Sequence, residues 1–158
     1  MNDPTANGPE TTAGRGTSPF EVVVTDAPDA GDVALISDAL DAFNVEATGV
    51  EDRRAPAVPV RDAGTGRVVG GLVGRTSLGL LFVDLLHLPR ELRGSGLGGE
   101  ILGRAEAEGL RRGCRQAVLY TISFQAPEFY RRHGWRVFGE VPCDPPGTSR
   151  VFMSKELG

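Results

Sequence analysis

The chain has 158 residues, which fits one domain, and its 40% hydrophobic and 24% charged residues are ordinary for a globular protein. No apolar run reaches the roughly 18 residues that a membrane span needs, and a net charge of -4 argues against nucleic acid as a partner. Two cysteines and two histidines do not make a disulfide framework or a metal site. The first residues carry neither a basic nor an apolar run, so we expect a cytoplasmic protein with no metal and no membrane association.

The N-terminal part of the sequence changes character at Phe20. Residues 1–19 consist largely of Thr, Gly, Pro, Asn and Ala, and they predict a disordered tail because they cannot bury enough apolar surface to order the chain. We therefore place the folded domain over residues 20–158. Residues 20–25 predict its first strand. Apolar residues then recur at the spacing of an amphipathic helix. These are Val33, Ile36, Leu40 and Phe43.

The middle of the chain predicts a hairpin followed by a central strand. Residues 57–62 and 68–74 are strand-like and are joined by the glycine-containing turn 63–66. Residues 78–88 form the most apolar stretch of the sequence, which indicates a central strand. After a glycine-rich turn, apolar residues share one face of a second helix that ends near Gly113. These are Leu97, Ile101, Leu102, Ala105 and Leu110.

The last third of the chain predicts a strand, then a short helix, and then a hairpin of two strands. The strand covers residues 116–121, and the helix opens at Ala126 and Pro127 and ends at Gly134. Residues 135–141 and 150–155 form the hairpin. The complete element order is β-α-β-β-β-α-β-α-β-β, which places the chain in the α/β (α+β) class with a sheet of mixed direction.

The glycine-rich turn between the central strand and the second helix is the most informative feature. Arg93 precedes a group of glycines at positions 94, 96, 98 and 99. A helix start presents unpaired backbone N–H groups and the positive end of the helix dipole, which together bind phosphate. Glycine allows a phosphate group to approach the backbone closely. The turn therefore indicates a phosphate-bearing cofactor, although a tight turn without a ligand would use the same residues.

Two common phosphate-binding motifs do not fit this turn. A P-loop requires a lysine after its glycines, and none is present. Gly94, Gly96 and Gly99 match the spacing of a dinucleotide-binding motif. That motif requires an acidic residue about 20 positions later, where this chain has Tyr120 and Thr121. A nucleotide-binding regulator that binds NAD is therefore the least favoured alternative.

The remaining pattern is Arg-x-x-Gly-x-Gly, matched by Arg93, Gly96 and Gly98. About 30 residues later, residues 126–135 read Ala-Pro-Glu-Phe-Tyr-Arg-Arg-His-Gly-Trp. In both motifs the sequence resembles the GNAT superfamily of acetyl-CoA-dependent N-acetyltransferases, from about residue 20 to residue 157 in element order. The resemblance implies a mostly antiparallel central sheet of about six or seven strands flanked by about three or four helices.

The resemblance also implies how acetyl-CoA is held. Backbone N–H groups of the turn would bind the pyrophosphate, and these residues are Arg93, Gly94, Ser95, Gly96, Leu97 and Gly98. Leu86, His87 and Leu88, at the end of the central strand, would pair their backbone with the pantetheine arm. A backbone N–H near Leu86 would then polarise the thioester carbonyl. Many family members carry asparagine where this chain has Ser123, whose hydroxyl, or Gln125 in its place, would contact the same arm.

Two side chains are candidates for proton transfer. By resemblance, Tyr130 would protonate the departing thiolate of coenzyme A. Asp84 would accept the proton of the amine if the central strand alternates regularly, because it would then share a face with Phe82, Leu86 and Leu88. For both residues a purely structural role is the alternative: a core ring for Tyr130 and an ion pair for Asp84.

The resemblance implies that the acceptor is a primary amine, and we expect a small molecule. Carboxylates in the regions that would line the acceptor side favour a cationic amine, although each alone is an ordinary surface group. These are Asp41, Glu46, Glu51, Asp52 and Asp144. The alternatives are a protein N-terminus or lysine as acceptor, or a non-catalytic acyl-CoA-binding module on the same fold. Cys114 and Cys143 do not have the setting of a nucleophile, so direct transfer is expected. The resemblance is compatible with a homodimer.

Overall fold

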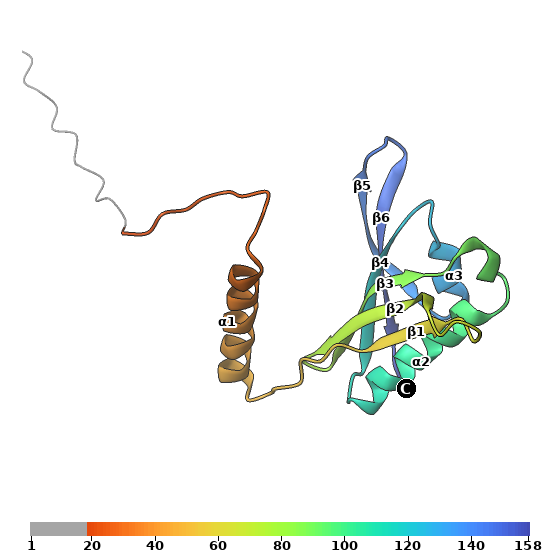
Figure 1. The fold of residues 1–158 in the computed structure, drawn as a ribbon, viewed down its shortest axis with the longest axis horizontal. Helices are drawn as coiled ribbons and strands as arrows, with labels where there is room; N and C mark the ends of the chain where they lie inside the picture. Colours follow the sequence, from red (N-terminus) through yellow and green to blue (C-terminus); the bar gives the residue numbers. More distant parts are fainter. Residues whose placement is uncertain (1–18) are drawn as a thin grey trace, which may run out of the picture. The chain divides into compact units, whose positions relative to one another are not determined.

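The computed structural model describes residues 19–158 and contains one six-stranded sheet in the order β1-β2-β3-β4-β6-β5 (Figure 1). All neighbouring strands are antiparallel except β3 and β4, which are parallel. The strands are β1 (Ala57–Arg61), β2 (Val68–Ser77), β3 (Leu80–His87), β4 (Gln116–Ile122), β5 (Arg136–Cys143) and β6 (Thr148–Glu156). The helices are α1 (Ala30–Thr48), α2 (Leu97–Arg111) and α3 (Pro127–Arg132), with one 3-10 turn, η1 (Arg90–Leu92). The predicted fold class is confirmed.

The core lies on one face of the sheet. In β4 and β6 the residues alternate between buried and more exposed, so Leu119 and Met153 point to the same side. Helix α2 packs on this side against β1, β2 and β3 and buries Ile101, Leu102 and Ala105. The predicted apolar face of the second helix therefore matches the buried stripe of α2, except that Leu110 is 43% exposed.

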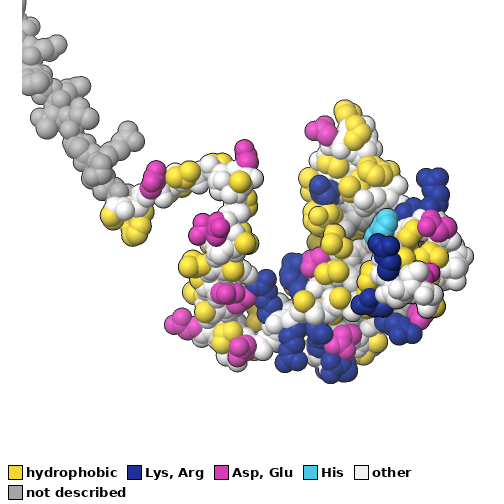
Figure 2. Space-filling model, viewed as in Figure 1, with side chains coloured by type: hydrophobic (Ala, Val, Ile, Leu, Met, Phe, Trp, Pro, Cys, Tyr) yellow, Lys and Arg dark blue, Asp and Glu magenta, His cyan; other side chains and the backbone are white. Residues whose placement is uncertain are grey.

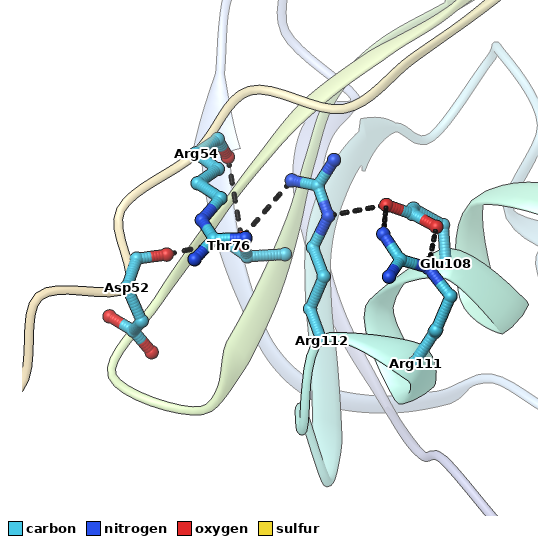
Figure 3. Close-up of polar contacts among 6 residues, drawn as sticks. All are labelled: Asp52, Arg54, Thr76, Glu108, Arg111 and Arg112. Carbon is cyan, nitrogen blue, oxygen red and sulfur yellow. Dashed lines mark hydrogen bonds and ion pairs between the residues drawn. The ribbon is translucent and has the colours of Figure 1, made fainter.

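The C-terminal end of α2 is tied to the end of β2 by polar contacts (Figure 3). Glu108 accepts hydrogen bonds from Arg111 and Arg112, and Arg112 also donates to the hydroxyl of the buried Thr76 in β2. The carboxylate of Asp52 accepts the N–H groups of the turn residues Leu78 and Gly79 at 2.7 and 3.0 Å. Asp52 thus holds a turn, which agrees with the alternative that it is an ordinary surface carboxylate.

The first predicted strand is absent. Residues 20–25 have no regular structure, and the side chains of Val22 and Val24 are each 94% exposed. A strand needs a neighbouring strand for its N–H and C=O groups, and none of the six strands of the sheet includes these residues. The predicted tail over residues 1–19 lies outside the described residues, apart from Pro19.

The chain divides into two units at Asp38 and Ala39, inside α1. Helix α1 extends beyond the four apolar positions that predicted it. The side chains at those four positions are more than half exposed. The unit that begins at Ala39 contains the whole sheet, α2 and α3.

The β5–β6 hairpin carries a patch of exposed hydrophobic side chains (Figure 2). On β5, which is an edge strand, Phe138 and Val141 are 64% and 54% exposed. The ring of Phe138 lies 6.3 Å from that of Phe152, and Phe152 in turn lies 5.8 Å from the ring of Tyr120. These aromatic rings occupy the face of the sheet opposite α2.

Candidate functional site

The glycine-rich turn leaves a series of backbone donors unpaired. Gly94 and Gly96 have φ of 78° and 87°, a left-handed conformation that glycine adopts without strain. Gly96 is the N-cap of α2. Among the described residues, none accepts a hydrogen bond from the backbone N–H groups of residues 94–99. Six donors at the positive end of a fifteen-residue helix form a site suited to an anion.

The side chains of the turn hold its shape. Arg93 donates from Nε to the carbonyl oxygen of Leu88 at 2.9 Å, and Ser95 donates from its hydroxyl to the carbonyl oxygen of Leu92 at 2.9 Å. Both bonds fold the segment after β3 back upon itself. The predicted residues of this turn therefore lie together, with their side chains turned to the protein and the amides of residues 94–99 left without a protein acceptor.

Gly98 and Gly99 allow α2 to pack closely against Phe129 of α3 and the following His133. A Cβ on Gly98 would lie 3.2 Å from Cε2 of Phe129, and a Cβ on Gly99 would lie 2.5 Å from Nε2 of His133. His133 donates from Nδ1 to the carbonyl oxygen of Phe129, 2.8 Å away, and the centres of the two rings lie 4.5 Å apart. His133, the C-cap of α3, is therefore partly buried and packs against the first turn of α2.

β3, which precedes the glycine-rich turn, and β4, which precedes α3, diverge from each other along their length. β3 and β4 pair only at Leu80–Gln116, Leu81–Ala117 and Phe82–Val118. β3 continues to His87 and pairs with β2 as far as Gly71, while β4 continues to Ile122 beside β6. The edge of β3 that faces β4 is therefore unpaired beyond Phe82, and it includes the predicted residues Leu86 and His87.

A bulge in β3 changes which residues share a face. Val83 is paired with Gly74 and Leu85 with Val73, so Asp84 is the extra residue. Leu86 and Leu88 therefore lie on the core side with Val83, as their burial shows. The expectation that Asp84 shares a face with Leu86 and Leu88 is wrong, because it assumed regular alternation.

The carboxylate of Asp84 is engaged in an ion pair. Arg75 of β2 donates from Nη1 to Asp84, and its guanidinium also lies 4.2 Å from the centre of the Phe82 ring. Both side chains of the pair remain more than one-third exposed. The ion pair supports the alternative that Asp84 has a structural role.

Tyr130 lies in the core between aromatic neighbours. Its side chain is 7% exposed, and its ring is edge-to-face with Phe129 at 5.0 Å and with Trp135 at 6.0 Å. Burial raises the pKa of Tyr130 to about 12, because the phenolate would lose its hydration. The residue is therefore a neutral hydrogen-bond donor throughout the physiological pH range, and among the described side chains none bonds its hydroxyl.

Ser123 and Gln125 close the end of β4. The hydroxyl of Ser123 accepts the backbone N–H of Ser149 at 3.1 Å, which joins it to β6. The side-chain carbonyl of Gln125 accepts the backbone N–H of Ile122 at 3.1 Å. The Ser123 hydroxyl proton and the Gln125 amide group remain able to donate to a ligand.

Neither a metal site nor a membrane span is found in the described residues. Residues 19–158 contain no group of three or more His, Cys, Asp or Glu side chains placed to hold a metal ion. None of the helices in this range has the length and apolarity to cross a bilayer.

Comparison with known proteins decides the family. No protein-family model matches the chain. An acetyltransferase of Agrobacterium fabrum is 35% identical over 135 residues, which cover 85% of this chain and 98% of that protein. The chain belongs to the GNAT superfamily of acetyltransferases. It is therefore an acyltransferase enzyme.

Further GNAT relatives agree in sequence and in structure. Blasticidin-S acetyltransferase of Streptomyces morookaense is 42% identical over 93 residues, which cover 58% of this chain and 68% of that protein. A crystal structure of a Bacillus cereus acetyltransferase has a TM-score of 0.70 and 28% identity, over 85% of this chain and 98% of that one. A structure from Agrobacterium tumefaciens, assigned as an acetyltransferase, has a TM-score of 0.79 and 34% identity, over 87% of this chain and 99% of that one. The family implies an acyl-CoA cosubstrate.

Sequence reasoning missed the contact between the two GNAT motifs. Phe129 and His133 lie four residues apart in and just after α3 and meet Gly98 and Gly99 of α2. Their four-residue spacing, which puts both rings on one face of a short helix, is the signal that could have found this contact.

Proposed function

We propose that the chain transfers an acetyl group from acetyl-CoA directly to a primary amine of a small molecule. The observation that carries the proposal is the row of unpaired N–H groups at residues 94–99 beside the separated ends of β3 and β4. A helix start with free amides fits a pyrophosphate. The unpaired edge of β3 fits an extended amide-bearing arm, which it would accept as an added strand. In this proposal the acetyltransferase domain is cytoplasmic and spans residues 20–158.

The proposed roles follow from the atoms available. Arg93, Gly94, Ser95, Gly96, Leu97 and Gly98 form the turn that binds pyrophosphate through backbone N–H groups. The backbone of Leu86, His87 and Leu88 binds the pantetheine arm, and a backbone N–H near Leu86 polarises the carbonyl oxygen. Ser123 donates to the same arm. The thioester supplies an activated acetyl group to the amine.

Tyr130 is the proposed acid. The amine nitrogen forms a bond to the acetyl carbon, the bond from that carbon to sulfur breaks, and the hydroxyl of Tyr130 gives its proton to the departing thiolate. Its high pKa ensures that the phenol is protonated beforehand. The amine proton leaves to a base or to water. Asp84, held beside Arg75 at the bulge where the strands separate, is the proposed acceptor of that proton.

Two observations bear on the alternatives. Burial raises the pKa of Cys114, which keeps it a thiol and supports transfer without an acylated cysteine. The 42% identical relative is named for an antibiotic substrate, blasticidin S, which favours a small-molecule acceptor over a protein N-terminus or lysine. Membership of an acyltransferase family disfavours the non-catalytic acyl-CoA-binding module.

The test is a screen of small amines with acetyl-CoA, followed by the Tyr130→Phe variant. Thiol release with an accepted amine is expected, and the variant should lose about 10²-fold or more in kcat while keeping the wild-type Kd for coenzyme A. Thiol release unchanged in the variant would remove Tyr130 from the chemistry. Binding of acetyl-CoA without transfer to any amine would favour the binding module.

A further inference from the structure

A partly buried carboxylate of α2 contacts Trp135, which lies between α3 and β5. Glu106 accepts the indole N–H of Trp135 at 2.9 Å on one oxygen and the ammonium group of Lys155 at 2.5 Å on the other. Its side chain is 14% exposed and that of Lys155 is 24% exposed. The only lysine and the only tryptophan of the chain therefore meet at one carboxylate. Because Trp135 is 2% exposed, its N–H requires a partner inside the protein, and Glu106 supplies it.

Trp135 in turn contacts Tyr130 in two ways. Its backbone N–H donates to the carbonyl oxygen of Tyr130 at 3.1 Å. Its ring meets the ring of Tyr130 edge-to-face, with centroids 6.0 Å apart and an interplanar angle of 68°. Gly134, with φ of 85°, lets the chain reverse directly after α3 so that both contacts form.

Helix α3 needs such support because it has only six residues. A helix this short is not stable by itself, so the direction of its side chains depends on tertiary contacts. Phe129 packs α3 against Gly98, and Trp135 contacts the ring of Tyr130. The contacts run without a gap from Lys155 through Glu106 and Trp135 to Tyr130.

We propose that Glu106 is a positioning residue for acetyl transfer, which holds Trp135 through its indole N–H and thereby holds the ring of Tyr130 in place. Lys155 fixes the second carboxylate oxygen and so sets the orientation of Glu106. This inference rests on the proposed role of Tyr130 as the acid. Glu106 itself touches neither the glycine turn nor the edge of β3.

The kinetic test compares Glu106→Ala with the conservative Glu106→Gln and with Trp135→Phe. Glu106→Ala should lower kcat about 10- to 100-fold while the KM for acetyl-CoA stays within about 3-fold, because misplacement affects the reacting geometry and not the cofactor turn. Glu106→Gln keeps an oxygen that accepts the indole N–H and should stay within about 3-fold of wild-type kcat. Trp135→Phe keeps a ring without the N–H and should fall near Glu106→Ala.

Glu108→Gln is the matched control, because it changes another ion-paired glutamate of α2 that bonds only arginines. Its kcat should equal that of the wild type. A kcat for Glu106→Ala within about 2-fold of the wild type would overturn the proposal. If Glu106→Ala does not fold, Trp135→Phe decides, since wild-type kcat in that variant would overturn the proposal equally.

A second measurement does not depend on turnover. In a Tyr120→Phe background Tyr130 is the only tyrosine, so its ionisation can be followed by ultraviolet absorbance. The pKa of about 12 should move toward 10 in Glu106→Ala and stay unchanged in Glu108→Gln. An unchanged titration in Glu106→Ala would overturn the coupling. If the wild type transfers no acetyl group, the proposed function fails, and this titration still decides whether Glu106 positions Tyr130.

Discussion

Tyr130 and Asp84 lie in different surroundings. The phenol of Tyr130 lies among Phe129 and Trp135 with 7% exposure, and this burial favours its neutral form. Asp84 is exposed and forms an ion pair with Arg75. Their chemistry depends on neighbours brought from other elements.

The raised pKa of Tyr130 predicts a specific loss of stability at high pH. The folded-state pKa of about 12 lies above the unfolded value of about 10, so the contribution to stability is complete below pH 10 and is lost as pH rises to 12. The free energy of unfolding of the wild type, relative to Tyr130→Phe, should fall by about 2 to 3 kcal/mol over this range. Urea unfolding of both proteins at several pH values checks it, and parallel profiles would contradict it.

Helix α2 has different demands at its two ends. Its first turn combines free N–H groups with glycines that admit Phe129 and His133, and its last turn is held by Glu108. Between these ends, a methyl group added to Gly103 would meet no atom within 4 Å, so packing does not require glycine there. Close packing therefore requires glycine at some positions of α2 but not at Gly103.

Alanine substitutions in α2 should distinguish the effect of helix propensity from the effect of close packing. Gly103→Ala should stabilise the protein by about 1 kcal/mol, because alanine is the better helix former and meets no neighbour. Gly99→Ala should destabilise it by about 1 to 3 kcal/mol, because the methyl group would displace His133. Denaturant unfolding measures both. Equal effects of the two substitutions would show that helix propensity alone governs these positions.

The ion pairs of Glu108 in the last turn of α2 predict that the protein loses stability at low pH. Hydrogen bonds from Arg111 and then Arg112 lower the pKa of Glu108 to about 2, below its ordinary value of 4.5. Its contribution to stability is therefore complete above pH 4.5 and is lost as pH falls toward 2. The difference in free energy of unfolding between the wild type and Glu108→Gln should shrink over this interval. A difference that stays constant with pH would contradict the assignment.

At the scale of the molecule, the cofactor should stabilise the fold, because its proposed site joins β3, the glycine turn and α2. Acetyl-CoA at 100 times its Kd should add about 2.7 kcal/mol to the free energy of unfolding. Thermal unfolding with acetyl-CoA, coenzyme A and NAD measures this. Coenzyme A should act like acetyl-CoA, and NAD should have no effect. No shift with either coenzyme would contradict the proposed site.

Local patterns determined most of the fold. The hairpin of β1 and β2, the apolar β3, the stripe of α2 and the final hairpin of β5 and β6 follow from periodicity and turn residues, which act within a few positions of the chain. The two GNAT motifs were also readable, because their glycines and aromatic residues have fixed spacing. Residues 20–25 were misassigned, since strand propensity does not supply a pairing partner.

The tertiary structure decided the relations between segments distant in sequence. The bulge at Asp84 depends on pairing with β2 and reverses the phase of Leu86 and Leu88, which alternation could not reveal. The contact of His133 with Gly99 and the chain from Lys155 through Glu106 and Trp135 to Tyr130 join residues up to 49 positions apart. Sequence by itself determined which local elements form and which motifs they carry, because those depend on neighbouring residues. Side-chain environments were decided only by packing, because burial and hydrogen-bond partners exist only once the elements meet.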